Sequence, residues 1–340
     1  MNNIIETLGG MLRPASDLSR VEVIPTSIKP INDIVFYCGG IPRGRITEIL
    51  AEESQGKSTF AQWLVSETQK QGGKAIWVDA EKTFDKNYAE KSGVDIANLS
   101  MLDFSFAQDL FYKIKLIFAY NMFDIVVVDS VNSVLPAELA DAKIESLSMN
   151  ERLISAKIWS SFFYTLEGGY RIKDLNTGKL VKSNVITNII NEKKLVQEED
   201  EYIHKISQKK TALILINHKN PKVGVQFGTK WYTPGGKRKD FAYSIRLDIS
   251  RKKTETGQVA GVKNVLKYRI IEVRAVKNKV GIPLGTTQLK MDKDGRIFPL
   301  DEQDVEELKE VELVDEIQKI SDEEIEVEGS AFDKLSKKLQ

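Results

Sequence analysis

Short apolar runs alternate with amphipathic segments over the first two thirds of the chain. The runs are rich in Val, Ile and Leu and have the length of buried strands, and the segments between them carry apolar residues at helical spacing. Strands that alternate with helices indicate an α/β fold with a mainly parallel twisted sheet and helices on both faces. The pattern predicts strands at residues 46–50, 74–79, 123–129 and 211–217, and helices at 59–71, 85–92, 106–120 and 149–166.

After residue 242 the strands follow one another through short loops. We expect this part to extend the sheet in antiparallel fashion, with strands at 244–251, 266–277, 286–291 and 296–299. Three prolines in residues 1–33 favour an extended N-terminal arm with one short helix. A polar insertion at about 167–208 interrupts the core at 34–300, and Asn176-Thr177-Gly178 predicts a hairpin inside it. We expect residues 301–340 to form an acidic C-terminal tail.

The segment 51–58, with the sequence AEESQGKS, lies between a predicted strand and a predicted helix. This order is that of a phosphate-binding loop, in which backbone N–H groups and the helix N-terminus attract phosphate. Lys57 would reach the β- and γ-phosphates of a nucleoside triphosphate, and the Ser58 hydroxyl would ligate Mg²⁺. Such loops usually begin with Gly, and Ala51 would cost about 1 kcal/mol if this position needed a positive φ.

Three polar residues follow predicted strands at the carboxyl edge, where ligands bind in parallel α/β sheets. Asp129 is expected to hold the Mg²⁺ hydration shell, or else to cap the next helix. Glu81 follows the 74–79 strand, which we expect to neighbour the loop strand, and it either activates the attacking water or lies in a surface turn. His218 either contacts the γ-phosphate or makes a local hydrogen bond.

Charge is unevenly distributed along a chain of net charge zero. Residues 301–328 hold fourteen Asp or Glu and two Lys, a net charge of −12, the last twelve residues carry +2, and the first 300 therefore carry +10. A basic body with an acidic tail suits a protein that binds a polyanion and whose tail competes for the same surface, although a solvated tail without a partner is the alternative.

Other features restrict the class of protein. No apolar run is long enough for a membrane span, and residues 1–20 lack the layout of a signal peptide. Cys38 is the single cysteine, and it fits a buried structural thiol. His204 and His218 are the only histidines and do not form a metal cluster. We therefore expect a soluble cytoplasmic protein.

The loop at 219–239 combines glycines, cations and aromatic residues. Cations that follow a phosphate backbone and aromatic rings that stack on bases are the features of single-strand binding, whereas a lid or a partner-binding loop is the alternative. The expected contacts with single-stranded DNA are Lys222, Gly224, Phe227, Lys230, Trp231, Tyr232, Gly235, Gly236, Lys237 and Arg238.

Several motifs in order resemble the RecA-type DNA strand-exchange recombinases, over about residues 39–299 outside the insertion. They are GGIPRGRI (39–46), EESQGKST (52–59), VDAE (78–81), VVVDS (126–130) and VKNK (276–279). The resemblance implies a RecA-like P-loop ATPase core that uses ATP and Mg²⁺. It also implies filaments on single-stranded DNA, pairing with homologous duplex DNA, strand exchange, and single-strand-binding and mediator proteins as partners.

The resemblance also assigns roles to individual residues. Glu81 would be the catalytic glutamate, and His218 would sense the γ-phosphate. Lys277 and Lys279 would reach the ATP of the neighbouring subunit as a charge clamp, and Phe241 would lie at the subunit interface. The residues that would bind ATP are Glu53, Ser54, Gln55, Gly56, Lys57, Ser58, Thr59, Asp85 and Tyr88, of which Tyr88 would stack on adenine.

Residues 131–149 and 218–236 resemble the two DNA-binding loops of the family, although the first does not keep the acidic and glycine pattern. The sensor is usually Gln, and a His at this position is similar to phage members of the UvsX type. The insertion is longer than the corresponding segment of bacterial RecA. The globular C-terminal domain of bacterial RecA is not recognisable in this sequence after residue 299. These differences indicate a phage or mobile-element branch acting in the bacterial host cell. An accessory or mediator ATPase, or a ring-forming DNA motor on the same fold, remains an alternative.

Overall fold

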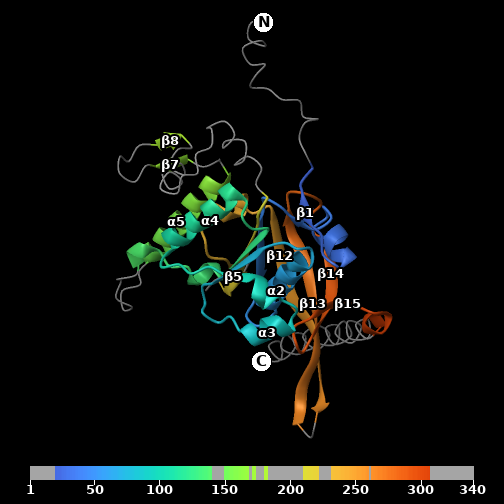
Figure 1. The fold of residues 1–340 in the computed structure, drawn as a ribbon. Coiled ribbons are helices and arrows are strands. Elements are labelled where there is room, and N and C mark those ends of the chain that lie inside the picture. Colours follow the sequence, from blue (N-terminus) through green and yellow to red (C-terminus); the bar gives the residue numbers. More distant parts are fainter. Residues whose placement is uncertain are drawn as a thin grey trace, which may run out of the picture.

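A nine-stranded sheet forms the centre of the computed structural model, which describes residues 20–139, 149–167, 171–173, 180–182, 210–221, 231–259 and 262–306 (Figure 1). The strand order is β15-β14-β13-β12-β3-β9-β6-β4-β5. In chain order the strands are β3 (Ile46–Ala51), β4 (Ala75–Asp79), β5 (Leu99–Met101), β6 (Ile125–Asp129), β9 (Ala212–His218), β12 (Ile245–Val259), β13 (Val262–Asn278), β14 (Thr286–Asp292) and β15 (Ile297–Pro299).

The sheet is parallel at one end and antiparallel at the other. Neighbouring strands from β12 through β3, β9, β6 and β4 to β5 pair in parallel. Strands β13, β14 and β15 continue the sheet beyond β12 with antiparallel pairing, which confirms the predicted fold class. The expectation that β4 neighbours β3 is wrong, because β9 and β6 lie between them. The carboxyl ends of these parallel strands nevertheless share one edge of the sheet.

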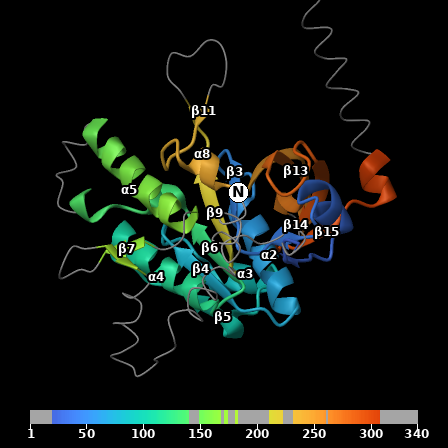
Figure 2. The same ribbon diagram turned by 90° about the horizontal axis from the view of Figure 1, so that it is seen from above.

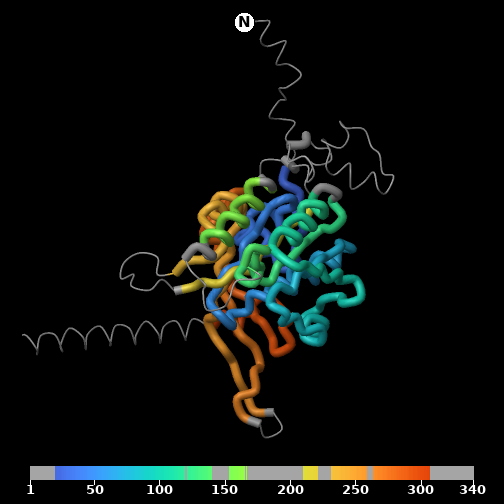
Figure 3. Tube along the Cα trace, turned by 90° about the vertical axis from the view of Figure 1, so that its left-hand side faces the viewer, coloured from blue at the N-terminus to red at the C-terminus, as the bar shows by residue number. Residues whose placement is uncertain are grey.

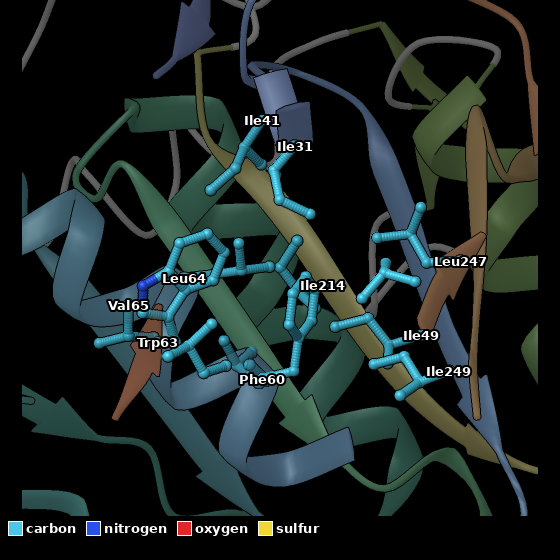
Figure 4. Close-up of a cluster of buried hydrophobic side chains, with 14 of the residues drawn as sticks. Ile31, Ile41, Ile49, Phe60, Trp63, Leu64, Val65, Ile214, Leu247 and Ile249 are labelled. Atoms are coloured by element: carbon cyan, nitrogen blue, oxygen red, sulfur yellow. The ribbon is translucent and has the colours of Figure 1, made fainter. Parts of the chain in front are cut away.

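Alternate residues of the central strands face opposite layers of the molecule. On one face, α2 (Lys57–Lys70) packs Phe60, Trp63 and Leu64 against Ile49 and Ile214 of the sheet (Figure 4). A π-helical turn, η2 (Ile31–Val35), covers the same face. On the opposite face lie α4 (Ala107–Tyr120) and α5 (Met149–Glu167) (Figure 2). They pack against the strand residues that alternate with those facing α2. This confirms the expectation that helices cover both faces of the sheet.

The helix ends follow local signals. Helix α2 begins at Lys57, two residues earlier than predicted, because the loop that precedes it ends at Gly56, whose φ is +95°. Helix α3 (Lys86–Lys91) has Asp85 as its N-cap, whose carboxylate accepts a hydrogen bond from the Tyr88 N–H at 2.9 Å. Helix α4 ends at Asn121 in the left-handed conformation. Single 3₁₀ turns are η3 (Ile96–Asn98), η4 (Val131–Ser133) and η5 (Ala137–Leu139).

Smaller elements surround the sheet. The described part of the expected arm, residues 20–33, contributes β1 (Val23–Ile24), which pairs with β2 (Ile41–Pro42). Strands β7 (Arg171–Lys173) and β8 (Leu180–Lys182) pair in antiparallel fashion, as the predicted hairpin requires, and the turn between them lies outside the described residues. Strands β10 (Asn220–Pro221) and β11 (Trp231–Tyr232) pair in the same way and precede α8 (Lys239–Ala242).

The hairpin formed by β12 and β13 is longer than predicted. Its outer part extends away from the body of the protein (Figures 1 and 3). Among the helices of the described ranges, none combines the length and the apolar character needed to cross a membrane.

Candidate nucleotide-binding site

The loop between β3 and α2 is folded for close approach of a ligand to the backbone. Ser54 and Gly56 have φ values of +58° and +95°, so the chain reverses sharply before the first turn of α2. Ala51 is buried as the last residue of β3 and is not among the residues with positive φ, so the missing glycine causes no strain there. The backbone N–H groups of the loop and the N-terminus of a 14-residue helix therefore meet at one point.

Lys57, the first residue of α2, is buried against the loop that precedes the helix. Its Nζ donates hydrogen bonds to the carbonyl oxygens of Glu52 at 2.7 Å and Ala51 at 3.4 Å. Burial lowers the pKa of Lys57, while the charges of Asp129, Glu81 and Glu53 act in the opposite direction. A partly desolvated ammonium held among carbonyl oxygens gains strongly from an anionic phosphate.

Asp129 at the end of β6 faces the first turn of α2. Burial raises the pKa of its carboxyl group to about 6, and the negative charge of Glu81 raises it further. A hydrogen bond with Ser58 acts in the opposite direction and lowers this pKa. A buried carboxylate beside a hydroxyl is a donor set of hard oxygen atoms, which is the kind that Mg²⁺ prefers. The residues present therefore fit the predicted metal site.

Glu81 forms the centre of a second polar group at the same edge. Its Oε1 lies 3.0 Å from His218 Nε2, at the end of β9, and accepts a hydrogen bond from the Ser130 hydroxyl. Although burial alone would raise it, the bonds from Ser130 and His218 and the charge of Lys57 hold the pKa of Glu81 below its ordinary value. Glu81 is therefore a carboxylate at neutral pH, as a residue that accepts a proton from water must be.

Tyr88 lies beside α2, the helix that follows the phosphate loop. Its hydroxyl is 3.1 Å from Thr59 Oγ1, and a side chain at Gly295 in the β14–β15 turn would collide with it, since an added Cβ would lie 2.6 Å from the hydroxyl oxygen. Asp85 is engaged as the N-cap of α3, so its role toward a base stays a prediction. The remaining loop residues lie at the surface or near it: Glu53 is exposed, and Gln55 accepts a hydrogen bond from the Arg251 N–H at 2.7 Å.

The aromatic and basic loop, residues 219–239, begins directly after His218. Lys219 makes a cation–π contact with Trp231 on β11, since its Nζ lies 5.3 Å from the ring centroid. The same Nζ forms an ion pair with Asp248 Oδ1 at 2.6 Å. Tyr232 and Lys237 are exposed, and the Arg238 guanidinium lies 5.3 Å from the ring centroid of Tyr164 on α5. The other expected DNA contacts, Lys222, Gly224, Phe227 and Lys230, lie outside the described residues.

Gly235 and Gly236 have a packing role. Both have positive φ, and a Cβ on Gly236 would lie 3.0 Å from the Ala156 carbonyl oxygen of α5. A Cβ on Gly235 would approach Lys239 and Val131. Gly236 therefore lets the chain pass close to α5, and Gly235 lets it pass close to Lys239 and Val131, on its way from β11 to α8. A direct contact of either glycine with DNA stays a prediction.

Lys277 and Lys279 are engaged within their own chain. Their Nζ atoms donate hydrogen bonds to the backbone carbonyl oxygens of Asp240 and Phe241 in α8. The side chain of Phe241 itself is 65 % exposed. The three residues predicted at a subunit boundary thus lie together on one surface, about the end of α8.

Sequence reasoning missed a buried polar cluster behind the site. Asn217 donates a hydrogen bond to Glu48 at 2.8 Å, and Arg246 donates another to the second carboxylate oxygen of Glu48. A signal was present for two of them, since Glu48 and Asn217 interrupt the otherwise mainly apolar strands β3 and β9. Ser130 donates a hydrogen bond to Glu81 and belongs to the VVVDS motif (126–130), but the sequence alone did not predict a function for it.

The strand order, the loop and the residues gathered at its edge define an α/β protein with a phosphate-binding loop. The sequence model of the RecA N-terminal domain matches residues 8–170 and 176–294. The chain belongs to the RecA family.

Bacterial RecA proteins resemble the chain over about four fifths of its length. It is 31 % identical over 286 residues to Protein RecA of Aquifex aeolicus, which covers 83 % of this chain and 70 % of the relative. The identity to Protein RecA of Thermus aquaticus is 32 % over 273 residues, covering 80 % and 67 %. For Symbiobacterium thermophilum the values are 34 % over 279 residues, 81 % and 66 %. The chain thus spans about two thirds of the length of these relatives.

Proposed function

We propose that the chain is an ATP-dependent homologous recombinase that polymerises on single-stranded DNA, pairs it with homologous duplex DNA and exchanges strands. One observation carries the proposal: Glu81, bonded to His218, lies at the strand edge that also holds the phosphate loop, and the aromatic and basic loop begins directly after His218. Membership of the RecA family and relatives with the printed name Protein RecA support it.

The chemistry of hydrolysis follows from the positions of these side chains. The loop N–H groups, the α2 N-terminus and Lys57 bind and orient the triphosphate, and a positively charged cradle stabilises charge that develops on the phosphoryl oxygens. Ser58 and Asp129 would hold Mg²⁺, which neutralises charge on the β- and γ-phosphates when bound. Glu81, kept ionised by Ser130 and His218, accepts the proton of the attacking water at a carboxylate oxygen.

The coupling to DNA rests on His218. Its ring contacts Glu81, and its backbone lies two residues before the β10–β11 hairpin, so a phosphate group that contacts the ring would also act on the loop that would hold the DNA strand. Self-association would bring Lys277 and Lys279 to the ATP of a neighbouring subunit, after they leave the carbonyl groups of α8.

The decisive experiment measures ATP hydrolysis with Mg²⁺, with and without single-stranded DNA. We expect strong stimulation by DNA and no hydrolysis by Lys57→Ala. Strand displacement between homologous DNA molecules is then measured with the purified protein. Hydrolysis by Lys57→Ala at the wild-type rate would refute the site assignment.

The same assays separate the second candidate, an accessory ATPase that binds DNA without exchanging strands. The unusual composition of residues 131–149 favours it, and only part of this segment, up to residue 139 and from 149, is described. DNA binding without stimulation or homologous pairing would support it, whereas rings and homology-independent unwinding would support a DNA motor. A phage or mobile-element origin rests on His218 and the insertion and stays a prediction, as does action in the bacterial cytoplasm with single-strand-binding and mediator proteins.

A further inference from the structure

Three polar side chains lie buried together on adjacent strands behind the candidate site. Glu48 on β3 and Asn217 on β9 are fully buried, and the Arg246 side chain on β12 is 16 % exposed. Glu48 and Arg246 are direct partners in the parallel register of β3 and β12. Their strand neighbours Ile49, Ile216 and Leu247 belong to the opposite core layer, so all three polar side chains lie on the face covered by α5 and α8.

Asn217 uses its whole amide group to join three segments. Its Oδ1 accepts a hydrogen bond from the backbone N–H of His218 at 3.0 Å. Its Nδ2 donates to Glu48 Oε1 at 2.8 Å and to the Pro234 carbonyl oxygen at 3.1 Å. The backbone of the predicted sensor, the strand that leads into the phosphate loop and the segment after β11 therefore depend on one side chain.

The Glu48 carboxylate is linked through Arg246 to Asp240 in α8. Its second oxygen accepts a hydrogen bond from Arg246 Nε, and Arg246 Nη2 donates to Asp240 Oδ1 at 2.6 Å. Lys239 is also buried here and lies 3.2 Å from Asp240 Oδ1. The backbone carbonyls of Asp240 and Phe241 accept the hydrogen bonds of Lys277 and Lys279. An unbroken series of polar contacts thus leads from His218 to the surface around Phe241.

The energetics of such a cluster favour a role other than simple stabilisation. Well-packed apolar residues of similar size often replace a buried ion pair at no loss of stability, whereas removing one partner alone is strongly destabilising. A buried pair therefore adds little stability but makes separate movement of its members costly. Here the members belong to the segments that would bind nucleotide, hold DNA and contact a neighbouring subunit.

We propose that Asn217 and the Glu48–Arg246 pair are positioning residues that make the β10–β11 hairpin and α8 respond together to nucleotide at the phosphate loop. The inference rests on the nucleotide site of the proposed function. A γ-phosphate that contacts His218 moves the end of β9, and Asn217 transmits the displacement to the segment at Pro234 and, through Glu48 and Arg246, to Asp240. Positioning by these residues affects the coupling between sites and leaves nucleotide affinity unchanged.

Arg246→Lys is the test variant, because lysine keeps the charge but lacks the fork that reaches two carboxylates at once. Arg43→Lys is a matched control: Arg43 donates to Asp124 at 2.6 Å and to the Lys210 carbonyl at 3.3 Å, at the opposite edge of the same strands. Asp240→Ala interrupts the far end at a side chain that is 46 % exposed, so it tests the coupling even if Arg246→Lys does not fold.

The first readout needs no DNA. Binding of a fluorescent ATP analogue gives the nucleotide affinity, and the emission of Trp231 upon addition of Mg²⁺ and a slowly hydrolysed ATP analogue reports the hairpin. Trp231→Phe supplies the background of Trp63, Trp77 and Trp159, which are buried. We expect unchanged nucleotide affinity in all variants, a Trp231 response in the wild type and Arg43→Lys, and loss of most of it in Arg246→Lys.

The second readout is the gain in affinity for single-stranded DNA upon nucleotide binding. A coupling free energy of 1–3 kcal/mol corresponds to a gain in DNA affinity of about 5- to 150-fold upon nucleotide binding. We expect this gain to be smaller by a factor of about five or more in Arg246→Lys and in Asp240→Ala. Basal hydrolysis stays near that of the wild type, which a merely destabilised protein would not show together with lost coupling. Wild-type coupling in both variants, or loss in Arg43→Lys as well, overturns the inference alone. A wild-type protein that binds no nucleotide overturns both the inference and the proposed function.

Discussion

Replacement of Asp129 by Asn is expected to stabilise the protein at neutral pH when metal and nucleotide are absent. The residue is 6 % exposed, and burial raises the pKa of its carboxyl group from 3.8 to about 6. The hydrogen bond with Ser58 lowers the pKa of Asp129 but does not cancel the effect of burial. At about 1.4 kcal/mol for each tenfold change in proton affinity, the charged form of Asp129 costs about 3 kcal/mol.

The sign of the pH dependence follows from proton linkage. Because the pKa is raised in the folded state, the folded protein binds more protons than the unfolded chain between about pH 4 and pH 6. The wild type therefore loses stability as pH rises through this window, and an amide at position 129 does not titrate. The difference in free energy of unfolding between Asp129→Asn and the wild type grows from near zero at about pH 3 to about 3 kcal/mol at pH 7.

Thermal unfolding in EDTA across this pH range measures the difference. For a chain of this size it corresponds to a melting temperature higher by roughly 5 °C at pH 7. Added Mg²⁺ stabilises the wild type and has less effect on the variant. Ser58→Ala removes a hydrogen bond that favours the ionised form, so it moves the wild-type transition to higher pH. Equal stability of wild type and Asp129→Asn from pH 5 to pH 8, or a less stable variant, would refute the reasoning.

Other predictions address hydrolysis, the base site and the tail. Glu81→Gln is expected to lower kcat by about 10²- to 10⁴-fold at unchanged ATP affinity, and a kcat near that of the wild type would exclude Glu81 as the base. Gly295→Ala should raise KM for ATP with little effect on kcat, because its Cβ would meet the Tyr88 hydroxyl at 2.6 Å, whereas Gly72→Ala has a similar positive φ and no neighbour within 4 Å and should leave KM unchanged. Deletion of residues 307–340 retains the bond between Asp304 and Lys290, and should tighten binding to single-stranded DNA and steepen its salt dependence; unchanged affinity would mean that the tail is inert.

Much of the fold is predictable because its strands are buried on both faces. Such strands are continuous apolar runs, as in 123–129 and 211–217, and α2 follows directly from the Gly-Lys-Ser loop. The edge strand β5 (Leu99–Met101) was missed because three partly exposed residues leave no apolar run. Strand order was the other limit, since pattern alone does not show that β9 and β6 separate β4 from β3.

The residues of the site also differ in how far the sequence predicts them. Lys57 and Ser58 belong to one local motif, and Asp129 ends a strand of clear pattern, so the sequence predicts them. Glu48, Asn217 and Arg246 are far apart in the chain, with separations of 169 and 198 residues between the bonded pairs. Their contact depends on the order β12-β3-β9, which becomes known only from the structure.

The long hairpin gives the sheet a gradient of local stability. Strand β13 is covered by β14 from Tyr268 to Arg274, but beyond the Glu255–Tyr268 pair the described residues of β12 and β13 pair with each other alone. An isolated two-stranded ribbon is marginally stable in water. Amide hydrogens in this outer part should therefore exchange with solvent by local opening, at a small fraction of the free energy needed to unfold the core. One continuous strand would thus contain both the most protected and some of the least protected backbone in the sheet.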